Sequence, residues 1–290
     1  MGQLISCLCV SRPSRWGLLQ RAILDFKRQT YADRELVVAV NSPQYAEQVR
    51  GFAAAAEIPA PVTVVRRDQR DQAALLLHAQ AAALGSLLAV WDDDNLNIPD
   101  RLTFAADAAE VFPDTAVMLG EALYHFYDTG EVFAVRFEHP GAPLSRRAAV
   151  TSLVLPRRLA PAWTFAGKSN SSIAAAADAM TAQRVPTMVI AGKLPYGHLI
   201  GVRGDNLRGE VYHRNLATSL PLTKTAEWLR ERKADVTEWL NQYVWDNRTL
   251  AASGPDGVAF ECQPKFVWPA NLFPIGGPDD GVVRTTEQLV

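Results

Sequence analysis

The sequence predicts an α/β protein with a mixed, largely parallel central sheet that is flanked by helices. Two observations predict this fold class. Within about the first hundred residues, short apolar runs alternate four times with segments of helical periodicity, which is the pattern of parallel strands joined by crossover helices. Beyond that region the chain is rich in strand-forming residues, and the turn signal Asp128-Thr129-Gly130 joins two of the segments. This signal predicts a β-hairpin.

In the first half, the predicted strands are apolar almost throughout, as strands covered on both faces are. They comprise residues 4–10, 35–40, 62–65 and 86–91. The predicted helices between them have apolar residues at helical spacing, as Leu18, Ala22 and Phe26 do. They comprise residues 18–29, 44–57 and 72–84. Gly85 follows the last of them in a helix-ending position.

In the second half, helices and strands alternate less regularly. Helices are predicted over residues 99–111, 171–183 and, as an amphipathic segment, 224–243. Strands are predicted over residues 116–127, 131–138, 148–155, 187–191 and 198–202. The tail from Ser253 onward is rich in Gly and Pro, which predicts a segment that wraps the surface.

Composition favours an ordinary cytoplasmic globular protein. A formal net charge of −2 over 290 residues gives no electrostatic attraction to nucleic acid or to anionic membranes. No apolar stretch approaches the roughly 20 residues of a membrane-spanning helix. The first residues of the sequence lack the pattern of a secretory signal peptide. Gly2 satisfies a loose myristoylation pattern, but the same residues are needed for the first strand. The cysteines Cys7, Cys9 and Cys262 predict buried thiols in a reducing compartment.

The most informative segment is the acidic triplet Asp92-Asp93-Asp94, at the end of the fourth predicted strand. Three consecutive carboxylates repel one another there unless a positive charge compensates them. A divalent cation such as Mg²⁺ or Mn²⁺ takes hard oxygen ligands and also binds a diphosphate. Open parallel sheets bind ligands at the carboxyl ends of their strands. A solvated acidic turn that caps the helix after Pro99 is the alternative interpretation of the triplet.

The triplet belongs to a series of ordered motifs. Residues 5–13 form a strand followed by an Arg-Pro turn, residues 22–31 form a helix that ends in Gln-Thr-Tyr, and residues 35–38 form a strand that starts with Glu-Leu. Residues 90–94 contain the triplet, and residues 99–102 read Pro-Asp-Arg-Leu. Together these segments resemble the opening of the inverting family 2 glycosyltransferases, including their DxD motif, and so imply the GT-A fold. The resemblance covers residues 4–104 well and residues 115–215 loosely.

The resemblance implies roles for residues near the donor nucleotide. Ser11 and Arg12, in the turn after the first strand, would lie near the nucleotide. Asn41 stands where the family usually has an aspartate that reads the base. The donor would be a nucleotide-diphosphate sugar of the UDP or GDP type.

The resemblance also implies a metal, Mn²⁺ or Mg²⁺, that neutralises the leaving diphosphate as a Lewis acid. Asp92 would contact the ribose and the metal, and Asp93 would belong to the donor-binding set. Asp94 would be a direct metal ligand. Enzymes of this fold often use a late histidine as a further ligand, and His213 is the candidate.

The sequence departs from the family pattern at three places. Val40-Asn41 replaces the acidic pair that is usual after the second strand, so the identity of the base stays open. Leu76-Leu77 replaces an Arg-Asn pair. Residues 169–172, Ser-Asn-Ser-Ser, stand where a Glu-Asp pair supplies the general base for the acceptor, and they cannot take a proton at neutral pH. Asp178, on the same predicted helix, is the remaining weak candidate for the base.

We therefore expect metal-dependent transfer of a sugar, with inversion, to a hydroxyl of a glycan, a small molecule or another hydroxyl-bearing molecule. One alternative is a non-catalytic nucleotide-sugar-binding protein on the same scaffold, which the missing Glu-Asp pair favours. The other is a nucleotidyltransferase, although the first strand lacks the Gly-rich, basic loop that holds a triphosphate.

The predicted organisation is a single domain followed by a tail. It divides into a nucleotide-sugar-binding half at 1–104, an acceptor-side half at 105–220, a C-terminal helix at 221–250 and the tail at 251–290.

Overall fold

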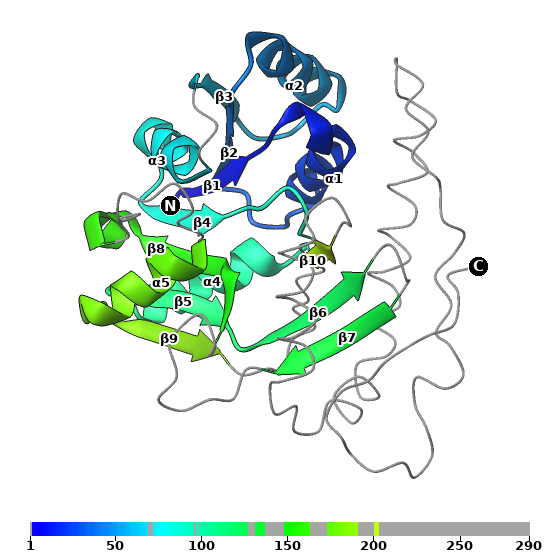
Figure 1. The fold of residues 1–290 in the computed structure, drawn as a ribbon. Helices are drawn as coiled ribbons and strands as arrows, with labels where there is room; N and C mark the ends of the chain where they lie inside the picture. Colours follow the sequence, from blue (N-terminus) through cyan, green and yellow to red (C-terminus); the bar gives the residue numbers. More distant parts are fainter. Residues whose placement is uncertain are drawn as a thin grey trace. The chain divides into compact units, whose positions relative to one another are not determined.

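Figure 1 shows the computed structural model of the chain. It describes residues 2–68, 72–95, 97, 99–126, 131–136, 148–162, 173–190 and 200–202. The chain divides into two compact units. The first unit comprises Met1–Asp93, Pro99–Leu119 and Pro140–Ala191, and the second comprises Asp94–Ile98, Gly120–His139 and Gly192–Val290.

The first unit is built on a seven-stranded sheet in the order β3-β2-β1-β4-β8-β5-β9. Its strands are β1 (Ile5–Val10), β2 (Arg34–Val40), β3 (Val62–Arg66), β4 (Leu87–Val90), β5 (Ala116–Leu119), β8 (Ala149–Pro156) and β9 (Thr187–Ile190). Among these described strands, β8 alone runs antiparallel to its neighbours, and the other six share one direction. The predicted mixed, largely parallel sheet is confirmed.

Helices cover both faces of this sheet (Figure 1). The helices α1 (Trp16–Lys27), α2 (Pro43–Ala55) and α4 (Arg101–Val111) pack against one face, and α3 (Gln72–Ala82) and α5 (Ile173–Ala182) pack against the other. Short 3₁₀ turns, η1 (Pro13–Arg15) and η3 (Arg157–Ala162), follow β1 and β8.

Each sheet face supports its own apolar core because side chains alternate along a strand. Leu8 of β1 contributes to the core beneath α3 and α5, whereas its neighbours Cys7 and Cys9 contribute to the core beneath α1, α2 and α4. Both thiols are buried, as the sequence predicts for residues on one face of the first strand.

The second unit contains a three-stranded sheet in the order β10-β6-β7. Its strands are β6 (Glu121–Phe126), β7 (Glu131–Arg136) and β10 (Ile200–Val202). The strands β6 and β7 are antiparallel and pair from Phe126 with Glu131 onward, which confirms the predicted hairpin. The single strand predicted over residues 116–127 is wrong: Gly120 separates β5 from β6, and the two strands belong to different sheets.

Gly85 does not end helix α3, as the sequence predicts, and glycine is required there for another reason. Helix α3 ends at Ala82, and the φ of Gly85 lies outside the left-handed range. A Cβ at Gly85 would instead lie 2.5 Å from the carbonyl oxygen of Leu4 and 2.6 Å from Oγ of Ser6. Such distances are far below van der Waals contact, so glycine is required because the loop passes directly against the start of β1.

Several predictions lie outside the described residues. They include the helix at residues 224–243, the tail from Ser253, the segment at residues 169–172, His213 and the thiol of Cys262. In the described part of the chain, no helix combines the length and the apolar character that crossing a membrane requires. The domain boundaries given above stay predictions.

Candidate functional site

The candidate site lies at the carboxyl ends of neighbouring parallel strands. Strand β1 has β2 on one side and β4 on the other. After β1, the chain adds β2 and β3 on one side, and it then crosses back and places β4 on the other side of β1. Open α/β sheets bind ligands at such a switch point. Ser11 follows β1, Asn41 follows β2, and Asp92 stands two residues after β4. The fold thus brings the three predicted segments together at the carboxyl ends of β1, β2 and β4.

Asp93, the middle residue of the triplet, is held by two residues from the turn after β1. Its exposed fraction is 3%. Ser11 Oγ donates a hydrogen bond to Asp93 Oδ2 at 2.7 Å, and Arg15 Nη2 lies 2.8 Å from Asp93 Oδ1. Both carboxylate oxygens therefore have charged or hydroxyl partners, whose hydrogen bonds are among the stronger ones in proteins. These contacts favour a positioning role for Asp93.

Tyr45 extends this contact into helix α2. Its hydroxyl lies 2.9 Å from Ser11 Oγ, and burial raises its pKa, an effect that the hydrogen bond to Ser11 partly opposes and the charge of Asp93 reinforces. Because the single Ser11 proton points to Asp93, the Tyr45 hydroxyl is the donor to Ser11. Helix α2 places Tyr45 by means of its N-cap, Ser42, whose Oγ accepts from the Tyr45 backbone N–H at 3.3 Å.

Asp92 and Asp94 flank the anchored Asp93, and both are half-buried. The described residues hold no group of three or more His, Cys, Asp or Glu side chains that could bind a metal by themselves. Mg²⁺ and similar ions, however, are commonly bound by one or two carboxylates together with water and substrate phosphates. The carboxylates of Asp92 and Asp94 are of the ligand type that such ions take.

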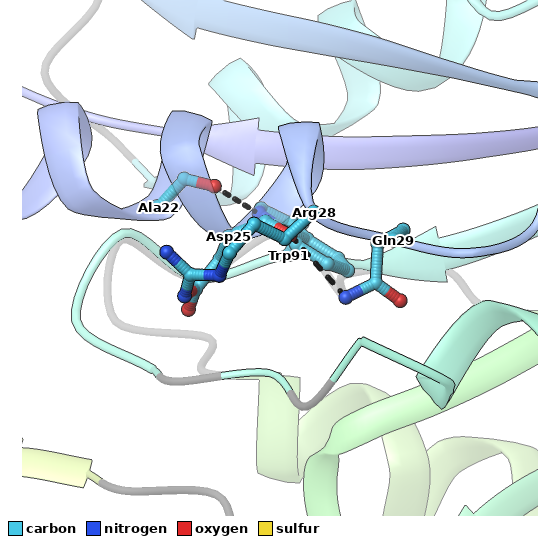
Figure 2. Close-up of polar contacts among 5 residues, drawn as sticks. All are labelled: Ala22, Asp25, Arg28, Gln29 and Trp91. Atoms are coloured by element: carbon cyan, nitrogen blue, oxygen red, sulfur yellow. Dashed lines mark hydrogen bonds and ion pairs between the residues drawn. The ribbon is translucent and has the colours of Figure 1, made fainter. Parts of the chain in front are cut away.

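Trp91 is locked in place immediately before the triplet. It is fully buried, and its Nε1 donates to the carbonyl oxygen of Ala22 in α1 at 3.0 Å, as Figure 2 shows. Its ring meets that of Phe26 edge-on, with centroids 6.0 Å apart. The guanidinium of Arg101 also lies 5.0 Å from the Trp91 ring centroid and donates to the carbonyl oxygen of Val90 at 2.7 Å.

The end of helix α1 carries a partly buried ion pair close to Trp91. Asp25 is fully buried and pairs with Arg28 one turn later. Gln29 Nε2 donates to the Asp25 carbonyl oxygen at 3.3 Å, so these residues form a polar group beside the Trp91 indole (Figure 2).

Gln29 and Thr30 also attach the end of α1 to the start of α4. The Leu102 backbone N–H donates to Gln29 Oε1 at 3.1 Å. The Thr30 backbone N–H donates to the Pro99 carbonyl oxygen at 2.9 Å, and its hydroxyl donates to Asp100 Oδ1 at 2.8 Å. The Gln-Thr-Tyr and Pro-Asp-Arg-Leu motifs therefore contact each other. These contacts hold the start of α4, the first helix after the triplet.

The other predicted site residues occupy separate places. Arg12 is exposed in the turn after β1, and Asn41 is half-buried after β2. Asp178 is half-buried within helix α5, and His213 lies outside the described residues. The roles assigned to these four residues stay predictions.

Sequence reasoning missed Arg15, Tyr45 and Arg101. For Arg101 a signal exists, because it precedes Ala105 and Ala109 at four-residue spacing and so shares the buried face of α4. A charged residue on the apolar face of a helix indicates a specific buried partner. Arg15 and Tyr45 carry no comparable signal, since their contacts depend on strands that are distant in sequence.

The sequence and the fold were compared with known proteins. The profile of the family described as "Glycosyl transferase family 2" matches residues 11–159, which is just over half of the chain. No curated protein sequence matches.

Solved structures with a similar fold include a mannosyltransferase, PcManGT from Pyrobaculum calidifontis, in complex with GDP-Man and Mn²⁺. The two share 14% sequence identity over 88% of this chain and 76% of that one, with a TM-score of 0.53. TarS from S. aureus, residues 1–349, matches at 13% identity over 88% of this chain and 76% of that one, with a TM-score of 0.49. The likeness to PcManGT shows a shared GT-A fold.

Proposed function

The chain belongs to glycosyl transferase family 2, and we propose that it transfers a sugar from a nucleotide-diphosphate donor to an acceptor hydroxyl, with inversion. The observation that carries the proposal is the anchored Asp93. Ser11 and Arg15 bind both of its oxygens at the switch point of the sheet. These contacts support the proposal, because they hold Asp93 at the carboxyl ends of the strands, where open α/β sheets bind ligands. A solvated acidic turn would need no such contacts.

In this reaction the acceptor oxygen forms a bond to the anomeric carbon of the donor sugar. The bond from that carbon to the phosphate oxygen breaks, and the nucleoside diphosphate leaves with both bonding electrons. Attack from the face opposite the leaving group inverts the anomeric centre. The acceptor proton passes to a base, for which we retain Asp178 as the candidate on α5.

We propose that Asp92 and Asp94 hold a divalent ion, Mn²⁺ or Mg²⁺, and that His213 adds a further ligand. When bound, the ion supplies positive charge that stabilises the leaving diphosphate. Asp93 keeps its two neighbours in position through Ser11 and Arg15. The structurally similar mannosyltransferase contains GDP-Man and Mn²⁺, which supports testing this combination first.

We further propose that Arg12 and Asn41 contact the donor nucleotide. Arg12 is exposed in the turn after β1, and Asn41 follows the adjacent strand β2. An amide side chain both donates and accepts hydrogen bonds, so Asn41 suits recognition of a base edge. Binding measurements with UDP, GDP, CDP and dTDP will identify the base of the donor.

The first test measures thermal unfolding of the wild type with each diphosphate, with and without Mn²⁺. A ligand at about 100 times its dissociation constant adds roughly 2.7 kcal/mol of stability. We expect one diphosphate to raise the Tm only with Mn²⁺, and we expect Asp94→Asn to abolish the increase. Asp107→Asn, at an exposed position of helix α4, is the matched control and should respond like the wild type. If no diphosphate raises the Tm of the wild type, the donor site is wrong.

The non-catalytic alternative rests on residues 169–172, which are Ser-Asn-Ser-Ser in place of the expected Glu-Asp pair. It predicts that the same diphosphate stabilises the protein while its sugar conjugate is neither transferred nor hydrolysed. Release of diphosphate from the donor, assayed with a panel of acceptors, separates the two functions. Loss of release in Asp178→Asn with unchanged diphosphate binding would identify the base.

A further inference from the structure

Arg101 is a buried cation at the first position of helix α4. Its exposed fraction is 4%. One guanidinium nitrogen, Nη2, donates to the Val90 carbonyl oxygen at 2.7 Å and to the Thr151 carbonyl oxygen at 3.3 Å. Val90 is the last residue of β4 and Thr151 belongs to β8, so this side chain ties together two adjacent antiparallel strands and α4.

Burying a guanidinium is costly unless hydrogen bonds and opposite charges compensate it. Burial lowers the pKa of Arg101 to about 10, while Cys7, Asp92 and Asp25 act in the opposite direction. The side chain therefore remains cationic at neutral pH. Of these groups, the ones that carry a negative charge at neutral pH are the carboxylates of Asp25 in α1 and Asp92 in the triplet.

The position of Arg101 connects this charge to the triplet. Val90 and Trp91 directly precede Asp92, and Arg101 contacts both of them, through the carbonyl hydrogen bond and through its stacking on the Trp91 ring. A change at Arg101 therefore removes both contacts that hold the two residues immediately before Asp92. A displacement of about 1 Å in a site of this kind can reduce activity by two orders of magnitude.

We infer that Arg101 is a positioning residue of the donor site, which fixes the end of β4 and Trp91 immediately before Asp92. This inference rests on the proposed function, because it assigns Arg101 to the binding of the metal and diphosphate. A purely structural arginine would instead support the fold and leave ligand affinity unchanged.

The chain offers a matched control in Arg34, the first residue of β2. It is also buried, at 6% exposure, and donates to the carbonyl oxygens of Phe26 and Lys27 at 3.3 and 3.2 Å. Its guanidinium lies 5.3 Å from the Phe26 ring centroid, and Phe26 in turn meets Trp91 edge-on. Arg34 thus contacts the other ring of the Phe26–Trp91 pair, and it lies at the amino end of its strand, whereas the triplet follows the carboxyl end of β4.

The experiment compares Arg101→Gln and Arg101→Lys with Arg34→Gln and Arg34→Lys. For each variant, urea unfolding gives the stability, and calorimetric titration of the folded protein with the diphosphate that stabilises the wild type, in Mn²⁺, gives the dissociation constant. We expect Arg101→Gln to weaken diphosphate binding at least tenfold. Arg101→Lys keeps the charge and should recover part of the affinity. Both Arg34 variants should lose stability and bind like the wild type.

Equal affinities in the wild type and Arg101→Gln would overturn the inference, as would equal weakening in the Arg34 and Arg101 variants. If Arg101→Gln does not fold, Arg101→Lys decides: weaker binding than in Arg34→Lys supports the inference, and unchanged binding overturns it. If no diphosphate binds to the wild type, the proposed function fails and this inference fails with it. If only the inference about Arg101 is wrong, the wild type still binds the diphosphate, so the two failures are distinguishable.

Discussion

At the scale of single residues, the hydroxyl of Ser11 is the centre of the candidate site. It donates to Asp93 and accepts from Tyr45, so three side chains from separate elements share two short hydrogen bonds. Tyr45 keeps its proton over the whole physiological range, because burial raises its pKa. The direction of donation, from Tyr45 to Ser11 to Asp93, is therefore constant.

We predict that Tyr45→Phe lowers the free energy of unfolding by about 0.5–1.5 kcal/mol, the usual net contribution of one hydrogen bond. Urea unfolding at pH 7 measures the change. Tyr31→Phe is the control, since the Tyr31 hydroxyl donates to the Gln3 carbonyl oxygen in an exposed position and its loss should have a smaller effect. If Tyr45→Phe is as stable as the wild type, Tyr45 does not support Ser11.

At the scale of elements, the loop from α3 to β4 is fastened to the start of β1 and β2. Glu35 Oε1 accepts from the Leu84 and Gly85 backbone N–H groups at 2.6 and 3.2 Å, and Ser6 Oγ lies 2.8 Å from the Gly85 nitrogen. These hydrogen bonds account for the buried glutamate near the start of β2. The loop that they hold leads directly into β4.

We predict opposite effects for alanine at two glycines. Gly85→Ala places a Cβ against Leu4 and Ser6 and should cost about 1–3 kcal/mol of stability, as overpacking does. Gly51 lies within helix α2, where an added Cβ meets nothing within 4 Å. Gly51→Ala should therefore stabilise the protein by about 0.5–1 kcal/mol. Thermal unfolding measures both changes, and a stable Gly85→Ala protein would contradict the close approach.

At the scale of the whole molecule, burial of Cys7 in the core beneath α1, α2 and α4 couples unfolding to the titration of its thiol. Burial raises the pKa of the Cys7 thiol from 9.0 to about 12. The unfolded chain releases this proton near pH 9 while the folded protein retains it. The corresponding stability is fully present below pH 9 and is lost progressively as the pH rises toward 12.

Between pH 9 and pH 10, this titration should lower the stability of the wild type by about 1 kcal/mol. Cys7→Ala lacks the thiol, so over the same interval its stability should fall by about 1 kcal/mol less than that of the wild type. Urea unfolding of both proteins at pH 7, 8, 9 and 10 measures the difference. A constant difference between pH 7 and 8 is the internal control, and parallel curves up to pH 10 would show that Cys7 does not titrate as burial requires.

The sequence by itself determined the fold class and the location of the candidate site. The alternation of strands and helices is a local pattern, and the residues that follow β1, β2 and β4 are adjacent to their strands in sequence. Since the carboxyl ends of parallel strands share one edge of a sheet, the order of elements alone predicts that Ser11, Asn41 and Asp92 lie on that edge. The family 2 motifs add the expectation of a sugar donor there.

Only the tertiary structure decided which residues of the site support which others. The contact of Ser11 with Asp93 joins residues 82 positions apart, and Thr30 meets Asp100 across 70 positions. No local periodicity encodes such pairs, because they depend on how the strands are ordered in the sheet. For the same reason the sequence placed one strand where Gly120 separates two sheets, and it read Gly85 as a helix end where the structure has a close approach to β1.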